Sequence, residues 1–329
     1  MTRFLLRRFF LSIITMIAVS MLAFVIMEAP PGDYVSSLIA GMEATGTAVS
    51  KEMAQQMRER YGLDKPVYVR YFRWIWGVLH GDFGRSQALG LPVTEAIGDR
   101  LALTISVSLA AMVVSWGIAL PIGIYSAVHQ YSVGDYVATI LGFMGLAIPN
   151  FLLALLLLYI GYKYLGTDVG GLFSPQFRQA PWSWAKVWDL LKHIWIPAIV
   201  LGMSPIAGLI RVMRANLLDE LGKPYVVTAR AKGLPEWRVI LKYPVRMALN
   251  PFASFIGYWL PALIGGGTIV SVVLSLPTLG PIYLSSLVQQ DMFLAGAIVL
   301  LLGILTVIGT FLSDLLLMAV DPRIRMEGR

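Results

Sequence analysis

The residues best suited to contact another molecule lie in one polar stretch, Leu218–Asn250, between two long apolar runs. Extended back to Arg214, this connection carries a dense set of cations: Arg214, Lys223, Arg230, Lys232, Arg238, Lys242 and Arg246. Basic residues at this density hold a connection on the cytoplasmic side of a membrane. Two interpretations are open on chemistry alone. The stretch is either a solvated loop that fixes topology or a surface that meets a partner.

Local signals divide this connection into two helices. Pro224 suits the first turn of a helix and Gly233 suits the position just past its end, so YVVTARAK is expected to be helical over roughly 13 Å. A helix this short has little stability alone and must be held by packing. One of its sides is predicted to carry small and polar residues at helical spacing: Tyr225, Thr228, Ala229 and Lys232.

From Pro235 the stretch EWRVILKYPVRMAL predicts a single second helix. Its residues Trp237, Ile240 and Leu241 repeat at helical spacing and are expected to lie against the membrane interface. Arg238 and Lys242 are four residues apart and share a face that could meet lipid headgroups or a protein.

The elements around this connection belong to a membrane protein. The chain has 329 residues, of which 57% are apolar and only 14% are charged, against about 25% charged in soluble domains. An apolar helix of about 20 residues crosses a hydrocarbon core of about 30 Å. The sequence therefore predicts an all-α polytopic bundle with six spans: Phe9–Met27, Ala102–Val128, Tyr136–Tyr162, Ile194–Val212, Phe252–Leu276 and Leu294–Val320.

The distribution of basic residues predicts the orientation of these spans. Cations at both ends of the chain and in residues 214–250 favour the cytoplasm, whereas Pro277–Phe293 lacks Lys and Arg and is expected outside. Three segments follow: a cytoplasmic N-terminus and first span (1–28, read as a retained signal anchor), an extracytoplasmic segment (29–100), and a core transmembrane domain (101–329) with the cytoplasmic loop 214–250. In the outer segment Ser50–Tyr61 is predicted to be a helix that is capped by Ser50 and stopped by Gly62.

Several kinds of chemistry find no signal in the chain. There is no GxxxxGK[ST] phosphate loop, GxSxG, HExxH or CxxC pattern, cysteine is absent, and the three histidines are far apart. We therefore predict no catalytic residue, no metal site and no ATP hydrolysis by this chain. The net charge of +7 suits contact with an anionic lipid bilayer rather than with nucleic acid, because most cations flank spans.

Ionisable residues are absent from the centres of the predicted spans. Asp314 and Arg211 lie toward cytoplasmic ends, where pairing or snorkelling is expected. This argues against a proton-coupled transporter. A stand-alone secondary transporter that uses backbone-coordinated sodium, or a channel, is the alternative interpretation.

One stretch, TARAKGLPEWRVILKYPVRMALNP, resembles the cytoplasmic "EAA" loop of ABC-importer permeases in the dipeptide/oligopeptide branch. The family's glycine matches Gly233, and its Glu-Ala-Ala positions fall on Val227, Thr228 and Ala229, of which only the last Ala is kept. The family's terminal Pro falls on Arg246. Other stretches resemble the branch in order along the chain: Arg58–Ser86, Pro92–Ser108, Ile148–Leu157, Ser275–Gly280 and Asp321–Arg325.

The resemblance implies the fold of a type I ABC importer and a place in a prokaryotic plasma membrane, with both termini cytoplasmic. It implies a permease forming half of the pathway for peptides or similar small solutes. The implied partners are a second permease subunit, two ATPase subunits that bind ATP and Mg²⁺, and an extracytoplasmic substrate-binding protein. Coupling to the ATPases would fall on Tyr225, Thr228, Ala229, Arg230, Ala231, Lys232, Gly233 and Leu234.

Two residues are candidates for the substrate pathway. Asn150 follows Pro149, a point where helix geometry can break, and Ser271 is a hydroxyl within a predicted span. Close helix packing and helix–helix hydrogen bonds are the alternative roles of such residues.

Overall fold

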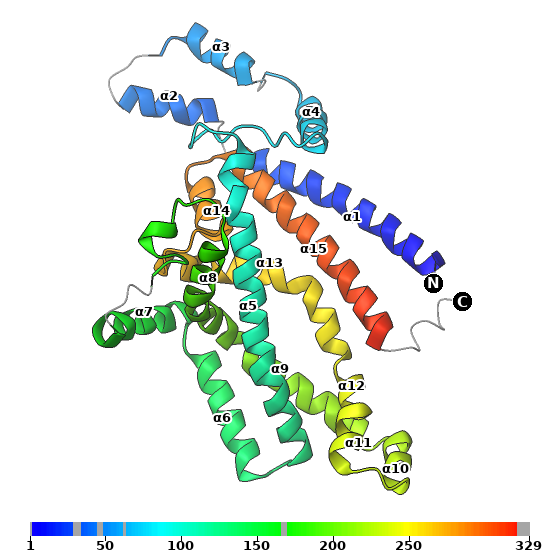
Figure 1. Ribbon diagram of the computed structural model, residues 1–329. Helices are drawn as coiled ribbons and strands as arrows, with labels where there is room; N and C mark the ends of the chain where they lie inside the picture. The colour runs from blue at the N-terminus through cyan, green and yellow to red at the C-terminus, as the bar shows by residue number, and fades with distance from the viewer. Residues whose placement is uncertain (1, 29–33, 45–48, 62–63, 166–169, 321–329) are drawn as a thin grey trace.

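The protein is built from α-helices, shown in Figure 1. The computed structural model describes residues 2–28, 34–44, 49–61, 64–165 and 170–320. No β-strand occurs in these ranges apart from an isolated bridge between Arg85 and Pro92. The predicted all-α class is confirmed.

Among the described residues, four helices are long and apolar enough to cross a membrane. They are α1 (Thr2–Glu28), α5 (Val93–Val128), α9 (Trp195–Leu221) and α15 (Met292–Val320). They coincide with the first, second, fourth and sixth predicted spans. Their apolar stretches are Leu6–Ile26, Val93–Val128, Trp195–Leu221 and Met292–Ala319.

The third predicted span, Tyr136–Tyr162, is broken rather than continuous. It consists of α6 (Val133–Ala147) and α7 (Asn150–Ile160), which a π-helical turn, η1 (Gly161–Leu165), extends, and the two halves are bent by 93°. Pro149 has no N–H to donate and disfavours a helical conformation of Ile148, which is extended (φ −84°, ψ 120°). Asn150 is therefore the first residue after the break.

The count of six spans is not confirmed. By length and composition the described residues provide four spans, or five if the bent pair is one. The helix α13 (Asn250–Val273) occupies the fifth predicted position without being among them. It crosses α15 closely, because a Cβ on Gly257 would lie 2.9 Å from Cα of Thr310.

The most extensive packing between two helices is that of α5 with α9. Ser115 Oγ donates to the carbonyl oxygen of Gly202 at 2.8 Å, and a Cβ on Gly202 would lie 3.0 Å from the carbonyl oxygen of Ala111. Small residues thus allow the two backbones to approach, as in other membrane helix pairs. Farther along α9, Met213 and Leu217 are fully buried in a second cluster that also contains Phe252 of α13.

The first and last long helices run antiparallel beside each other. Arg8 Nη2 lies 3.0 Å from Asp314 Oδ1 at one end, and Phe24 shares a buried cluster with Leu300 at the other. Between them, Val19 faces Gly303, where an added Cβ would lie 2.3 Å from Val19 Cγ1. The expected pairing of Asp314 is confirmed.

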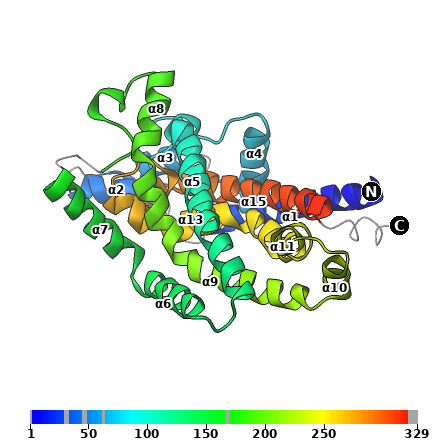
Figure 2. The ribbon, with the colours of Figure 1, turned by 60° about the horizontal axis from the view of Figure 1, so that its bottom comes forward.

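Short helices gather at two opposite ends of the molecule (Figure 1). At one end lie α2 (Tyr34–Ala44), α3 (Lys51–Tyr61) and α4 (Val67–Leu79). Ser50 Oγ accepts a hydrogen bond from Met53 N at 3.2 Å, which confirms the predicted cap of α3. Gly62, the expected stop, lies outside the described residues. At the other end lie α10 (Pro224–Ala231), α11 (Glu236–Lys242) and α12 (Pro244–Ala248), which come forward in Figure 2.

Three further short elements lie on the side of the molecule away from α10–α12 (Figure 1). They are η2 (Pro175–Phe177), α8 (Trp184–His193) and α14 (Leu279–Val288). Asp291, which is fully buried, accepts hydrogen bonds from Ser86 Oγ at 2.5 Å and Ala88 N at 3.1 Å. This carboxylate fixes the loop before α5 to the start of α15.

Candidate coupling site

The short helix α10 begins and ends where its sequence predicts. Lys223 is extended (ψ 147°) and Pro224 is the first helical residue. Gly233 has a φ of +74°, a left-handed conformation that favours glycine, and its N–H donates to the carbonyl oxygen of Arg230 at 2.9 Å. The turn at Gly233 folds the chain back so that α11 lies against α10.

The packing that holds α10 comes from the chain itself. Val226 and Ala229 are buried with Val239 of α11, and Tyr225, Leu234 and Tyr243 pack around them. Ala229 is only 5% exposed. Its methyl group therefore faces α11, whereas Thr228 and Lys232, with which helical spacing groups it, are exposed.

The opposite side of α10 is exposed. Val227 is 57% exposed, and Thr228 and Ala231 are exposed on the same side. With Pro224 they repeat at helical spacing, and we call these four residues the outward stripe: Pro224, Val227, Thr228 and Ala231. Arg230, Lys232 and Gly233 are also exposed. The outward stripe is thus small, largely apolar and bordered by cations, which suits close approach of another protein.

An ion pair joins α10 to α11 across the turn. Arg230 donates from Nη2 to Glu236 Oε1 at 2.6 Å and from Nε at 3.1 Å. The hydrogen bond from Arg230 lowers the pKa of the Glu236 carboxyl below its ordinary value, and the same bond raises the pKa of Arg230. Tyr225 OH donates to Glu220 Oε2, so α10 is also fixed to the end of α9.

The predicted second helix is divided. The backbone of Tyr243 (φ −111°, ψ −77°) separates α11 from α12, because Pro244 cannot continue the helix. Ile240 is buried against α9, so the prediction that it shares an interfacial face with Trp237 and Leu241 is wrong for Ile240. Trp237 and Leu241 are 62% and 53% exposed.

The short helices of this site are joined to the long helices by very short connections, and α9 is fixed in turn to α6. Gly222 and Lys223 alone separate α9 from α10, and Leu249 alone separates α12 from α13. Arg214 Nη2 on α9 donates to Asp135 Oδ2 at 3.0 Å, which joins α9 to the start of α6. The sequence did not indicate this pair, because its partners are 79 residues apart.

The predicted pathway residues occupy different surroundings. Asn150 begins α7 at the bend. Ser271 is buried and lines a cavity of about 20 Å³ with other hydroxyl groups, those of Thr104, Ser108 and Thr278. This volume fits about one water molecule. Asn150 does not line the cavity, and a pathway role for either residue stays a prediction.

Comparison with known proteins identifies the chain. A family model described as the binding-protein-dependent transport system inner membrane component matches residues 119–326. A second model, for the N-terminal part of such membrane components, matches residues 1–108. The chain belongs to this family of ABC-importer permeases.

Similar proteins match the permease over nearly its whole length. It is 36% identical to the oligopeptide transport system permease protein AppB of Bacillus subtilis, covering 98% of this chain and 99% of the relative. It is 33% identical to the dipeptide transport system permease protein DppB of Escherichia coli K12, with 99% of each covered. A putative peptide transport system permease protein of Brucella abortus is 32% identical over 99% of this chain and 100% of its own. The permease is thus a multi-pass inner-membrane transport subunit.

Proposed function

We propose that the permease forms half of a peptide pathway with a second permease subunit. Two ATPase subunits complete the importer, one of which binds at α10 of this chain, and an extracytoplasmic binding protein delivers substrate. The relatives described above are named as oligopeptide, dipeptide and peptide transport permeases, which favours peptides as the substrate. The observation that carries the proposal is the outward stripe of α10. It is an exposed surface of small residues on a helix whose opposite side packs against α11.

The proposed coupling follows from how α10 is held. A groove on an ATPase subunit takes the outward stripe together with Arg230, Lys232, Gly233 and Leu234. When the ATPases close, α10 and α11 move as one body because the buried cluster and the Arg230–Glu236 pair join them. That motion reaches α9 through Tyr225 and Glu220, and it reaches α13 through α12.

Orientation is part of the proposal. We place the start of α1 and the loop 214–250 in the cytoplasm and residues 29–100 outside, with residues 101–329 as the core domain. The exposed side of α8 suits a membrane interface, because Trp184 is 90% and Trp188 is 62% exposed. Tryptophan is enriched at membrane interfaces.

Reconstitution tests this function. The permease, its partner permease and the two ATPases are placed in liposomes with the binding protein, and uptake of labelled trialanine is measured. We expect uptake that requires ATP hydrolysis and stops when the binding protein or the ATPases are omitted. Uptake by the permease alone, without ATP, would instead support a stand-alone transporter or channel.

A further inference from the structure

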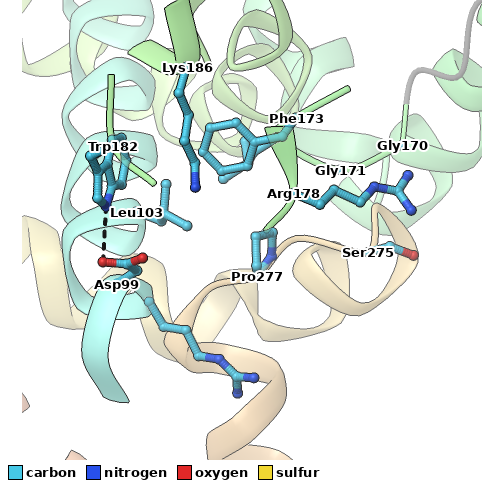
Figure 3. A pocket seen from close by; sticks show the side chains of 12 residues that line it. Asp99, Leu103, Gly170, Gly171, Phe173, Arg178, Trp182, Lys186, Ser275 and Pro277 are labelled. Atoms are coloured by element: carbon cyan, nitrogen blue, oxygen red, sulfur yellow. Dashed lines mark hydrogen bonds between the residues drawn. The ribbon is translucent and has the colours of Figure 1, made fainter. Parts of the chain in front are cut away.

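A pocket of about 450 Å³ lies beside the N-terminal end of α5 (Figure 3). Its walls come from the first turns of α5, from the segment that leads into α8, and from the turn after α13. The polar residues that matter for its chemistry are Asp99, Arg100, Arg178 and Lys186, and its aromatic walls are Phe173 and Trp182. Pockets of this volume take small organic ligands.

Lys186 dominates the chemistry of this pocket. Its residue is 4% exposed, and its ammonium lies over the rings of Phe173 at 5.0 Å and Trp182 at 5.1 Å. Figure 3 shows the side chain reaching into the pocket between these two rings. Nζ donates to the carbonyl oxygen of Ala180 at 2.6 Å. An ammonium has three donors, so further donors are available to a ligand.

Among the described residues, no carboxylate pairs with the buried charge of Lys186. Within the part of the chain that the structure describes, none lies within 4.0 Å of Nζ. Asp189, on the same helix, is engaged by the N–H and hydroxyl of Ser174, each at 2.7 Å. Burying a cation without an opposite charge is costly. A ligand that brought a carboxylate would relieve that cost.

The rest of the lining favours an anion as well. Among the described residues that line the pocket, Arg100 and Arg178 carry positive charge and Asp99 carries a carboxylate. Asp99 Oδ1 accepts a hydrogen bond from Trp182 Nε1 at 3.0 Å, which fixes the ring and occupies one oxygen of the carboxylate. In the described lining, the buried ammonium of Lys186 thus lies beside apolar walls that suit the body of an organic anion.

We propose that this pocket binds the free carboxylate of a peptide, with Lys186 Nζ as the anchoring donor. Arg100 and Arg178 supply flanking positive charge, and Phe173 and Trp182 contact the apolar part of the peptide. The inference rests on the proposed peptide-import function. It adds that the permease itself recognises a peptide's carboxylate at this end of α5, apart from any selection by a binding protein.

Direct binding to the assembled importer, without its binding protein, tests this inference. Trialanine and trialaninamide, which differ in the terminal carboxylate, are titrated against the complex in nanodiscs by calorimetry. We expect trialanine to bind at least about tenfold more tightly, the worth of one charge-assisted hydrogen bond. Equal affinities of the two probes, or no binding of either, would overturn the proposal.

Three variants identify the groups responsible. Lys186→Met keeps the stem between the two rings and removes the charge, so the preference for trialanine should disappear. Lys192→Met, at an exposed position of the same helix, is the matched control and should keep it. Asp99→Asn can still accept from Trp182 and should bind trialanine more tightly. Weaker trialanine binding by Asp99→Asn, or an unchanged preference for trialanine in Lys186→Met, contradicts the proposal. If Lys186→Met fails to fold, trialanine binding by Asp99→Asn tests the proposal instead.

The reconstituted uptake assay distinguishes failure of the carboxylate site from failure of the proposed peptide import. If trialanine and trialaninamide are both imported and bind equally well, the carboxylate site is wrong while peptide import stands. If neither peptide is imported with all partners present, the proposed function itself fails.

Discussion

Arg230 Nη2 lies 2.6 Å from Glu236 Oε1, and this ion pair closes the turn at Gly233 between α10 and α11. The ion pair is one of two sets of contacts that hold α10 against α11. Outside is the ion pair, with side chains 43% and 54% exposed, and inside is the buried cluster of Val226, Ala229 and Val239. The loop is therefore a formed unit before any partner binds, which lets it transmit a displacement.

The ion pair should make the loop weakly sensitive to acid. The pKa of Glu236 is lowered in the folded loop by its bond to Arg230, so the pair stabilises the loop above the unfolded pKa of about 4.3. That stabilisation is lost as pH falls through the lower, folded pKa. Because both groups are substantially exposed, it amounts to less than about 1 kcal/mol. Hydrogen exchange of residues 224–242, corrected for intrinsic rate, should show lower protection at pH 3 than at pH 7. In Glu236→Gln this difference should be absent, and persistence of the full difference would contradict the assignment.

Gly233 is required for its backbone conformation rather than for space. Its φ is +74°, and an added Cβ would meet nothing within 4 Å. Gly233→Ala should therefore cost about 1–2 kcal/mol from left-handed strain alone, whereas Gly233→Asn should cost less. Gly222 also has open space but a φ of −83°, so Gly222→Ala is the matched control and should cost nothing measurable. Hydrogen exchange gives the free energy of opening of the 224–242 segment, which is compared among Gly233→Ala, Gly233→Asn and Gly222→Ala. Equal costs at Gly233 and Gly222 would exclude backbone strain as the reason for glycine.

The two sides of α10 should respond differently to substitution. Ala231 is exposed on the outward stripe, so Ala231→Trp should leave the loop folded and separate ATP hydrolysis from transport by blocking close approach. Ala229 is buried, so Ala229→Glu should cost several kcal/mol as an unpaired buried charge and unfold the loop itself. Transport per ATP hydrolysed, measured with exchange protection of residues 224–242, distinguishes the two. Full coupling in Ala231→Trp would mean that this side is not a docking surface.

The crossing of α13 with α15 should be intolerant of a methyl group. A Cβ on Gly257 would lie 2.9 Å from Cα and 3.0 Å from N of Thr310, and backbone atoms cannot move aside cheaply. We expect Gly257→Ala to destabilise the permease by about 1–3 kcal/mol. Gly208 of α9 has no atom within 4 Å of an added Cβ, so Gly208→Ala should be neutral or stabilising by up to about 1 kcal/mol. Thermal unfolding in detergent measures both, and an equal response would contradict the close crossing.

Features set by a few neighbouring residues were predictable from the sequence. Pro224 and Gly233 act on their own backbone, so the limits of α10 follow from them directly. Ser50 caps α3 for the same reason. At Pro149 the sequence indicated a possible break, but not the 93° bend, because that angle depends on how the two halves pack against other helices.

Features set by tertiary contacts were not predictable. The burial of Ala229 depends on where α11 lies, and helical spacing alone cannot say which side α11 covers. Asp135 and Arg214, like Ser86 and Asp291, come from distant parts of the chain and carry no local signal. The surroundings of Lys186 belong to the same class, since its rings come from an irregular segment before α8.

Site-directed cross-linking tests the central claim, that α10 docks on an ATPase subunit, most directly. The chain has no cysteine, so Thr228→Cys on the outward stripe carries the only thiol of the permease, and a thiol-reactive photo-cross-linker is attached to it in native membranes. Trp188→Cys, exposed on α8, is the control near the other end. If α10 docks on an ATPase subunit, we expect Thr228→Cys to form an adduct with an ATP-binding-cassette ATPase, identified by mass spectrometry. We expect no ATPase adduct from Trp188→Cys. A transport-competent Thr228→Cys permease that forms no ATPase adduct would contradict the docking of α10.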